Sequence, residues 1–425
     1  MKVFIENYGC TFNKADSQIM AGECIENNIQ LTDSIDDADV IIVNTCYVKL
    51  PTENKVVYRI QKLQEEFPDK VIIVSGCMVE IDPEKLDKIG PNCSWIGPHQ
   101  LNKTVEVINN AMSGEISRAC GFSKESKVNK NKITDDSYIH IIQICEGCTG
   151  ACTFCCTRFA RGPLNSYPIS DIVEEAKVAI ENGACEIQLT AQDTAAYGLD
   201  TGEKLSSLIK EVANINGNFR IRVGMMHPKN VLNDLDGIID AIKHDNVYDF
   251  IHLPIQTGSN KVLKEMRRGH NISQYYEIIN KFKKEIPNIT IATDIIVGYP
   301  TEDDNDFKLT CDLLEDIGPS LIHLSKYQHR KGALSSNLKE LPHNIMKERS
   351  KHLSNIKNQI TKRENDQLLG TVQNALVVEK GSKGGFIAKS DNYLPIIVDN
   401  VNLGDFIKVK INKTTSTYLK GEIIN

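Results

Sequence analysis

The first 112 residues alternate short apolar runs with longer amphipathic segments, which is the pattern of strands and helices taken in turn. The runs that predict strands are Val3–Glu6, Val40–Asn44, Val71–Ser75 and Ser94–Ile96. The segments with helical spacing are Asn13–Asn27, Thr52–Phe67 and Asn102–Ala111. Strands separated by helices indicate crossover connections, which produce a parallel sheet. We therefore expect residues 1–112 to form an α/β domain around a parallel sheet.

A second alternation begins at Tyr138, after a polar stretch rich in Lys, Ser and Asn over residues 113–137 that is typical of a linker. The predicted strands are Ile139–Ile144, Glu186–Thr190, Arg220–Gly224, Phe250–Leu253, Ile289–Val297 and Leu321–Tyr327. The predicted helices are Ile169–Asn182, Leu205–Asn214, Leu232–Lys243, Ser273–Lys284 and Asp303–Asp316. This series of βα units predicts a partial (βα)6 barrel over residues 138–367 rather than a complete eightfold barrel.

The pattern changes again in the C-terminal part. A charged helix is predicted over Asn344–Leu369, and residues 368–425 then hold short strands separated by Gly and Asn-Asp turns, which predict a small antiparallel β-barrel. Residues 343–425 carry 13 Lys and Arg against 8 Asp and Glu, whereas the whole chain has a net charge of −7. A mildly basic module on an acidic body fits phosphate binding, but a solvated charged helix explains the same charge count equally well.

The composition is that of an ordinary globular protein, 41% hydrophobic and 25% charged. No apolar run approaches the roughly eighteen residues of a membrane span, and Met1–Asn7 alternates like a strand rather than a signal peptide. We therefore expect a cytoplasmic protein. In that reducing compartment the 13 cysteines point to metal binding rather than to disulfides.

Cys148, Cys152 and Cys155 follow the first strand of the second domain with the spacing C-x3-C-x2-C. Three thiolates on a short loop bind three corners of a [4Fe–4S] cube and leave one iron open, whereas an electron carrier uses a fourth cysteine. An open iron that binds S-adenosylmethionine (SAM) is typical of radical-SAM enzymes. Two alternatives are a zinc site that adds Cys145 and a ferredoxin-type run, although the proline that follows such a run is missing here.

Cys10, Cys46 and Cys77 each follow one of the first three predicted strands. Because the carboxyl ends of parallel strands lie at one edge of a sheet, these thiols should converge. We expect a second three-cysteine cluster, again with an open iron; the alternative is three buried structural cysteines. The cysteines that we expect to have no such role are Cys24, Cys93, Cys120, Cys185 and Cys311.

Polar or glycine-containing sequences stand at the carboxyl end of every predicted strand of the barrel, where the βα loops gather and ligands bind. Isolated histidines there are more often hydrogen-bonded structural residues than ligands. Isolated arginines fit either the binding of phosphate or carboxylate or a structural ion pair. The residues in question are His227, His252, His329, Arg158, Arg161, Arg268 and Arg330.

Taken together, these motifs resemble the radical-SAM methylthiotransferases, nearly from end to end of the chain. Beside Cys10, Cys46 and Cys77, the blocks that carry the resemblance are Cys148–Cys155, Arg161–Pro168, Gln192–Asp200, His252–Ser259 and Gly298–Glu302. Arg161–Pro168 and Gln192–Asp200 are of the type found in the threonylcarbamoyladenosine tRNA branch of archaea and eukaryotes. Residues 368–425 resemble the family's RNA-binding TRAM barrel. Cys145, Cys156 and Arg330–Leu334 depart from the family's pattern.

The resemblance implies two [4Fe–4S] clusters and two uses of SAM. One SAM methylates a sulfur held at the cluster of Cys10, Cys46 and Cys77. The other binds at the cluster of Cys148, Cys152 and Cys155 and yields a 5′-deoxyadenosyl radical, which activates C2 of an adenine to receive the methylthio group. The residues that we expect to bind this cofactor are Gln192, Asp193, Arg222, Gln256 and Gly298.

The implied substrate is N6-threonylcarbamoyladenosine at position 37 of a tRNA anticodon loop. The implied partners are that tRNA and a one-electron donor such as flavodoxin or ferredoxin, with the sulfur source left open. Alternatives in the same family act on another tRNA adenosine or on an aspartate of a ribosomal protein. An alternative from a different class is a two-cluster electron carrier without catalytic activity.

Overall fold

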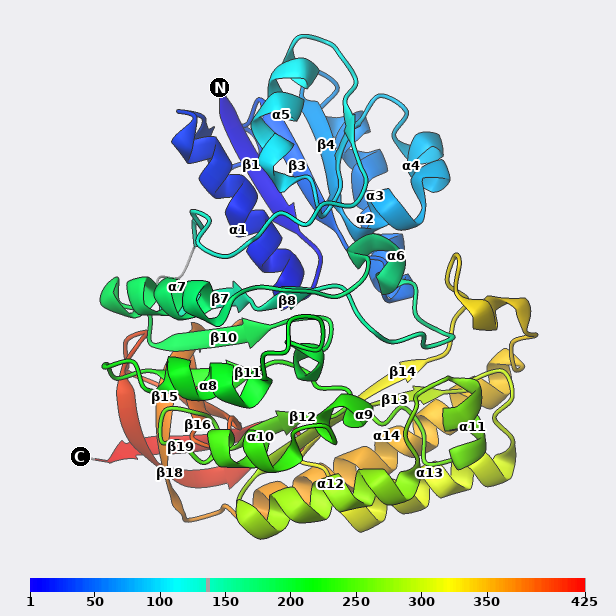
Figure 1. The fold of residues 1–425 in the computed structure, drawn as a ribbon, viewed down its shortest axis with the longest axis vertical. Helices are drawn as coiled ribbons and strands as arrows, with labels where there is room; N and C mark the ends of the chain where they lie inside the picture. The colour runs from blue at the N-terminus through cyan, green and yellow to red at the C-terminus, as the bar shows by residue number, and fades with distance from the viewer. Residues whose placement is uncertain (135–137, 425) are drawn as a thin grey trace.

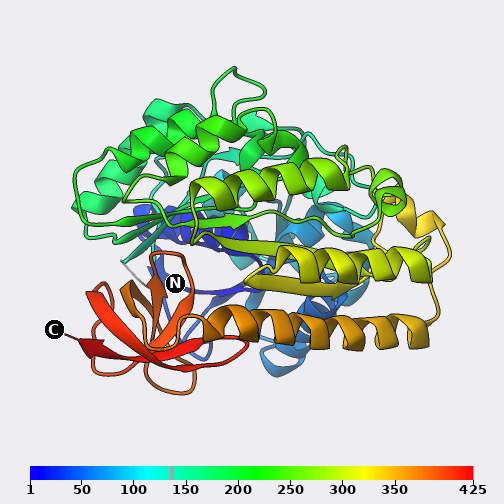
Figure 2. The ribbon, with the colours of Figure 1, turned by 90° about the horizontal axis from the view of Figure 1, so that it is seen from below.

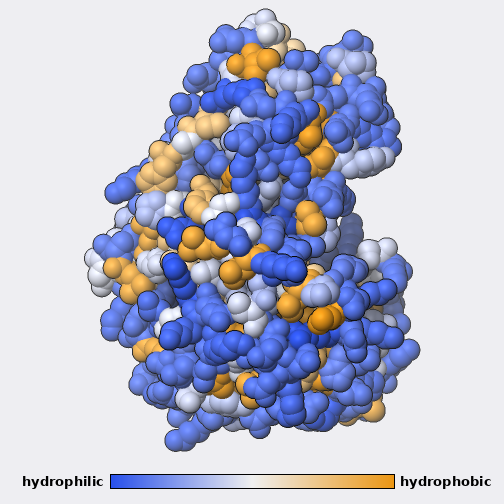
Figure 3. Space-filling view, turned by 90° about the vertical axis from the view of Figure 1, so that its right-hand side faces the viewer, coloured by the Kyte–Doolittle hydropathy of each residue, from blue (hydrophilic) through white to orange (hydrophobic). Residues whose placement is uncertain are grey.

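The computed structural model describes residues 1–134 and 138–424. Figure 1 shows an N-terminal sheet domain at the top, a series of βα units below it, and a C-terminal β-barrel beside the lower strands. Among the described residues, none of the helices combines the length and the apolarity that a membrane crossing requires. Figure 3 shows that one face of the molecule is covered largely by hydrophilic residues, with apolar residues in small scattered groups.

The N-terminal domain is a parallel sheet in the order β2-β1-β3-β4-β5-β6. Its strands are β1 (Lys2–Asn7), β2 (Gln30–Leu31), β3 (Val40–Thr45), β4 (Val71–Gly76), β5 (Ser94–Ile96) and β6 (Arg118–Ala119). Its helices are α1 (Thr11–Glu26), α2 (Leu50–Glu66), α3 (Cys77–Ile81), α4 (Pro83–Ile89), η1 (Leu101–Lys103) and α5 (Thr104–Met112). All six residues of β3 are buried, as expected for a central parallel strand with both faces covered.

The polar stretch over residues 113–137 differs in part from the linker that the sequence predicts. Within it, β6 pairs with β5 and extends the N-terminal sheet. The side chain of Lys127 is buried, with its Nζ 2.8 Å from Asp16 Oδ1 and 2.9 Å from Glu146 Oε1. At least one charge of this stretch therefore forms buried ion pairs between the N-terminal domain and the barrel domain instead of being solvated. Residues 135–137 lie outside the described part of the chain.

The second part confirms the predicted (βα)6 series. Its strands are β7 (Ile139–Gln143), β10 (Glu186–Thr190), β11 (Arg220–Val223), β12 (Phe250–His252), β13 (Thr290–Val297) and β14 (Leu321–Lys326). They form two parallel sheets, β7-β10-β11 and β12-β13-β14. A parallel bridge between Ile221 and Val247 continues the series from β11 to β12. The order places β7 and β14 at the two ends of a partial barrel.

Helices cover the outer face of this barrel. They are α7 (Ile169–Glu181), α8 (Leu205–Ala213), α9 (Pro228–Val231), α10 (Leu235–Ile242), α11 (Asn260–Glu265), α12 (Ile272–Glu285), α13 (Asp304–Ile317) and α14 (His343–Asp366). Short elements of the loops are β8 (Cys145–Glu146), α6 (Thr157–Arg161), β9 (Asn165–Ser166), η2 (Thr194–Ala196) and η3 (Leu334–Asn337). The helix expected over Leu232–Lys243 is α10, which begins three residues later at Leu235 with Asp234 as its N-cap, and the short helix α9 precedes it. The large apolar core lies between these helices and the outward residues of the strands.

The C-terminal part is a closed barrel of β15 (Val372–Lys380), β16 (Phe386–Ser390), β17 (Pro395–Val398), β18 (Phe406–Thr414) and β19 (Leu419–Ile424). It differs from the expected antiparallel barrel in one pairing, since β17 and β19 run parallel. Figure 2 shows α14 leading into this barrel, which lies below the βα units. Tyr393 joins the two parts, because its ring centroid lies 4.8 Å from those of both Tyr248 and Phe250.

Candidate functional site at the junction of two cysteine sets

The three cysteines of the N-terminal domain meet at the carboxyl end of its sheet. Cys10 precedes α1, Cys46 follows β3, and Cys77 opens α3 directly after β4. The buried Asn13 side chain connects two of them: its Oδ1 lies 3.5 Å from Cys10 Sγ, and its Nδ2 lies 4.0 Å from Cys77 Sγ. Burial and, second, the neighbouring Cys77 thiol raise the pKa of Cys46 to about 12. A metal that binds these sulfurs must therefore displace their protons.

The second set, Cys148, Cys152 and Cys155, lies on the loop between β8 and α6, at the carboxyl end of the barrel's first strand. Gly147 allows the loop to turn, because its φ is +84° and a Cβ there would collide with the carbonyl oxygen of Pro163. Two N–H donors reach the sulfurs. The Gly150 N–H donates to Cys148 Sγ at 3.2 Å, and Arg268 Nη1 donates to Cys152 Sγ at 3.4 Å. Donors of this kind orient and stabilise ligating thiolates.

The two additional cysteines beside this loop are packing residues. Cys145 is 0% exposed and belongs to the apolar core of the barrel, where β8 pairs it with Ser166. Burial raises its pKa well above the ordinary value. Cys156 is buried in the core of the N-terminal domain, with its Sγ 3.7 Å from the carbonyl oxygen of Tyr47. Both side chains point into apolar surroundings rather than join the three-cysteine set.

The four-cysteine zinc site is not what the structure shows. A tetrahedral zinc with bonds of about 2.3 Å brings its sulfurs to about 3.8 Å from one another. Within residues 1–134 and 138–424, no three cysteine sulfurs lie within 4.8 Å of one another. The described cysteines are therefore not drawn together as a tetrahedral zinc site requires.

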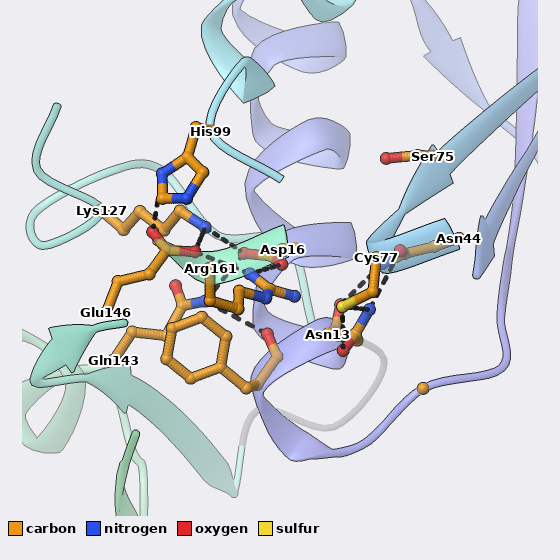
Figure 4. Close-up of polar contacts among 12 residues, drawn as sticks. Asn13, Asp16, Asn44, Ser75, Cys77, His99, Lys127, Gln143, Glu146 and Arg161 are labelled. Carbon is orange, nitrogen blue, oxygen red and sulfur yellow. Dashed lines mark hydrogen bonds and ion pairs between the residues drawn. The ribbon is translucent and has the colours of Figure 1, made fainter. Parts of the chain in front are cut away.

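A buried ion-pair network, drawn in Figure 4, joins the N-terminal domain to the two segments that flank the second cysteine set. Arg161, the last residue of α6, places Nη1 2.8 Å from Asp16 Oδ2 on α1 and 2.8 Å from Glu146 Oε1 on β8. Lys127 pairs with the same two carboxylates. All four side chains are buried. The network therefore fixes the N-terminal sheet domain against the loop that carries the second cysteine set.

Gln192 and Asp193, expected to bind the cofactor, use their side chains within the protein. Gln192 Oε1 accepts the Gly147 N–H at 2.7 Å, on the cysteine loop itself. Asp193 is buried and accepts from the His227 N–H at 2.8 Å and from Asn230 Nδ2 at 2.6 Å. Burial raises the pKa of Asp193. These residues hold the loop ends of β10 and β11 together beneath the cysteines.

Gln256 and Gly298 both have left-handed backbones, with φ of 76° and 78°. Gln256 donates its N–H to the Asp294 carbonyl at 2.9 Å and accepts from the Ile296 N–H at 3.0 Å, so its backbone is paired with β13. At Gly298 a Cβ would lie 2.5 Å from Met346 Cγ on α14. Helix packing therefore explains this glycine from within the protein.

Arg222 points to the inner face of the barrel, opposite the outward Ile221 and Val223 of the same strand. Its guanidinium lies 5.7 Å from the ring centroids of both Phe250 and Tyr393. Among the residues that the structure describes, Arg222 forms no ion pair. Unlike the Asp193 carboxylate, which accepts hydrogen bonds from within the protein, the Arg222 guanidinium lies beside aromatic rings.

The inner face also carries His252, Asp294 and His323, from three neighbouring strands. His252 Nε2 lies 3.0 Å from Asp294 Oδ2, so this histidine is hydrogen-bonded to a side chain of the protein itself. His227 is structural as well: its Nδ1 accepts the Lys229 N–H at 3.2 Å, and burial lowers its pKa to about 2.

Arg330 follows the last barrel strand and forms a contact between domains. It is buried, and its Nη1 pairs with Glu53 of α2. The adjacent Lys331 pairs with Asp82 and Glu84 of the N-terminal domain, each at 2.8 Å. The departure from the family's pattern at this strand end therefore coincides with a structural role.

Both cysteine sets fit the [4Fe–4S] clusters that the sequence implies. Each offers three sulfurs from separate positions, with polar side chains or N–H groups directed at them, and the extra cysteines nearby are turned into apolar cores. This donor set suits [4Fe–4S] clusters with one open iron better than a closed electron-transfer cluster.

Comparison with known protein families assigns each part of the chain. Residues 142–314 match the Radical SAM superfamily, and residues 366–424 match the TRAM domain. Residues 2–97 match a family described as uncharacterized protein family UPF0004.

Relatives cover the whole chain. A protein of Methanothermobacter thermautotrophicus named probable threonylcarbamoyladenosine tRNA methylthiotransferase is 54% identical over 419 residues, covering 99% of each chain. This chain belongs to that family. The human threonylcarbamoyladenosine tRNA methylthiotransferase is 33% identical over 435 residues, which cover 100% of this chain and 74% of the human one. These relatives confirm the prediction from the motifs that the chain belongs to the archaeal and eukaryotic branch of the methylthiotransferases.

A solved structure shows the same fold for the methylthiotransferase chain. The radical S-adenosylmethionine methyltransferase TsrM from Kitasatospora setae, with cobalamin and a [4Fe–4S] cluster bound, aligns with a TM-score of 0.59. The alignment covers 88% of this chain and 77% of TsrM at 11% identity. At that identity the likeness concerns the fold alone.

Proposed function

We propose that this protein transfers a methylthio group to C2 of N6-threonylcarbamoyladenosine at position 37 of a tRNA anticodon loop. The observation that carries the proposal is the junction itself, where two three-cysteine sets from different domains are fixed against each other through Arg161 and Asp16. In this proposal Cys10, Cys46 and Cys77 hold one [4Fe–4S] cluster, and Cys148, Cys152 and Cys155 hold the other. When bound, the clusters and SAM supply methyl transfer to sulfur and a radical that activates an aromatic carbon.

The chain's own residues supply positioning. The Gly150 N–H and Arg268 donate to sulfurs of the second set, and Gln192 holds the loop through Gly147. We retain Arg222 as a cofactor contact, because its charge faces the barrel interior beside two aromatic rings. The adenine must leave its stack to reach this interior, which suits an unpaired anticodon-loop base.

The remaining assignments belong to the same proposal. The units are residues 1–112, 138–367 and 368–425, with residues 113–137 between the first two. The TRAM-like C-terminal part meets the tRNA backbone, a small one-electron donor such as flavodoxin or ferredoxin supplies the electron, and the protein works in the cytoplasm. The net basic charge of residues 343–425 supports the contact with RNA phosphates.

The test separates the two cysteine sets in the anaerobically reconstituted full-length protein. Alanine at Cys10, Cys46 or Cys77 should preserve reductive SAM cleavage, measured as 5′-deoxyadenosine, and abolish methylthiolation of tRNA. Alanine at Cys148, Cys152 or Cys155 should abolish both. The matched control is Cys120→Ala, which removes an exposed cysteine outside both sets. Methylthiolated product from the first group of variants would remove the cluster at Cys10, Cys46 and Cys77 from the proposal.

The substrate is tested by mass spectrometry of tRNA nucleosides from cells with and without the gene. We expect the 2-methylthio form of threonylcarbamoyladenosine to disappear with the gene. An unchanged nucleoside profile together with loss of a methylthio group from a ribosomal protein would assign the related protein-modifying activity instead.

A further inference from the structure

Arg161 is a fully enclosed charge at the junction of the two cysteine sets. Its side chain is 1% exposed, and it lies six residues after Cys155. Nη1 alone serves both acidic partners, at 2.8 Å from Asp16 Oδ2 and 2.8 Å from Glu146 Oε1. The guanidinium also lies 4.7 Å from the centroid of the Phe12 ring. Two carboxylates, Arg161 and Lys127 therefore balance as a neutral group of four buried charges.

The other terminal nitrogen of Arg161, Nη2, forms no ion pair with these carboxylates. Nη2 is buried and has no hydrogen-bond partner among the described residues. Figure 4 shows the end of the guanidinium turned toward Cys77, on the side away from Lys127 and His99. Cys77 already has one donor nearby, since Asn13 Nδ2 lies 4.0 Å from its sulfur. A planar guanidinium that is anchored at Nη1 presents Nη2 in a fixed direction.

We propose that Arg161 is a positioning residue of the N-terminal cysteine set and donates a hydrogen bond from Nη2 to the Cys77 sulfur when that sulfur ligates iron. The inference rests on the proposed function only in taking Cys77 as a cluster ligand. A charged donor stabilises electron density on a ligating thiolate and so favours the reduced cluster, which raises its reduction potential. Because Arg161 stands on α6, the helix that follows the radical-forming loop, one side chain connects both cysteine sets.

The experiment isolates the N-terminal cluster. Full-length protein with Cys148, Cys152 and Cys155 all changed to alanine is reconstituted with iron and sulfide, and its remaining cluster is titrated potentiometrically under electron paramagnetic resonance. Arg161→Gln should make reduction about tenfold less favourable, a shift of about 59 mV to lower potential for a one-electron couple. Arg161→Lys, which keeps the charge but loses the second nitrogen, should shift it in the same direction by less. The matched control, Arg158→Gln on the exposed side of the same helix, should leave the potential unchanged.

Each result bears on the inference. An unchanged potential in Arg161→Gln, or a shift equalled by Arg158→Gln, overturns it. If Arg161→Gln fails to fold because two carboxylates lose their partner, Arg161→Lys decides: an unchanged potential in that variant overturns the inference. Failure of the proposed function would give a different result. The protein with Cys148, Cys152 and Cys155 changed to alanine would then bind no cluster at Cys10, Cys46 and Cys77.

Discussion

Replacing Gly298 with alanine separates two explanations for a glycine at the end of β13. The sequence indicated a close approach of the cofactor, whereas the structure shows a close approach of α14. The backbone at Gly298 has a φ of 78°, and a Cβ there would lie 2.5 Å from Cγ and 2.9 Å from Sδ of Met346. Real Cβ atoms do not come this close to another atom, so the Met346 side chain or the backbone on either side of the contact must shift.

The expected cost follows from these two features. The left-handed conformation costs a non-glycine residue about 1–2 kcal/mol, and extra volume in a filled site costs about 1–3 kcal/mol. We therefore expect Gly298→Ala to lower the free energy of unfolding by about 2–5 kcal/mol. Met346→Ala removes a buried side chain and costs about 2–5 kcal/mol by itself, but it also removes the collision. In the double variant only the backbone cost is added, which predicts a coupling energy of about 1–3 kcal/mol.

Urea unfolding of the four full-length apo-proteins, followed by circular dichroism, measures the coupling, and calorimetric titration of the cluster-loaded proteins measures SAM affinity. Gly202→Ala is the matched control, since Gly202 also has a positive φ, of 87°, but a Cβ there meets nothing within 4 Å. The packing explanation is wrong if Gly298→Ala is no less stable than Gly202→Ala and loses SAM affinity instead.

Three further predictions concern charge and docking. Arg330→Met should cost about 1–3 kcal/mol in urea unfolding, because it removes one of the two partners of the buried Glu53 carboxylate and leaves only Lys85. The half-exposed Lys331→Met should cost less than about 1 kcal/mol, and equal effects of the two substitutions would contradict this. Burial alone would raise the pKa of Glu175, but Lys132 and His140 outweigh it and lower that pKa to about 2. The stability that the Glu175 carboxylate contributes is then present above about pH 4.5 and is lost as the pH falls toward 2. The difference in unfolding free energy between the wild type and Glu175→Gln should therefore narrow over that pH range. A constant difference would refute the ion pairing of Glu175. Tyr393→Ala should loosen the C-terminal barrel and speed proteolysis near residue 370, whereas Tyr418→Ala, at an exposed ring, should not.

Local signals made most of the fold predictable. Helix α13 was expected over Asp303–Asp316 and begins one residue later, because Asp303 and Asp306 form a capping box at its start. Its end is marked by Gly318 in the left-handed conformation. The convergence of Cys10 and Cys77 at one edge of the sheet was predictable too, since it follows from parallel strands, whereas the Asn13 side chain that contacts both was not predicted.

Distant partners explain what the sequence did not reveal. Lys127 lies in a polar stretch whose composition is that of a solvated linker, yet its partners are 111 and 19 residues away. Arg161 fitted anion binding or an ion pair equally well, and only the placement of α1 decides for the ion pair. Helix α3 spans just five residues, too short for a periodic pattern. None of these features leaves a local signal.

The four balanced charges at the junction also limit how the chain can diverge. Asp16, Lys127, Glu146 and Arg161 come from helix α1, the connecting stretch, the short strand β8 and helix α6 after the cysteine loop. Losing any one leaves a net buried charge, and breaking a buried pair in this way costs about 3–5 kcal/mol. A chimera that joins the N-terminal domain of one relative to the barrel of another must therefore inherit all four together. Across the family, these positions should change as a set or remain the same.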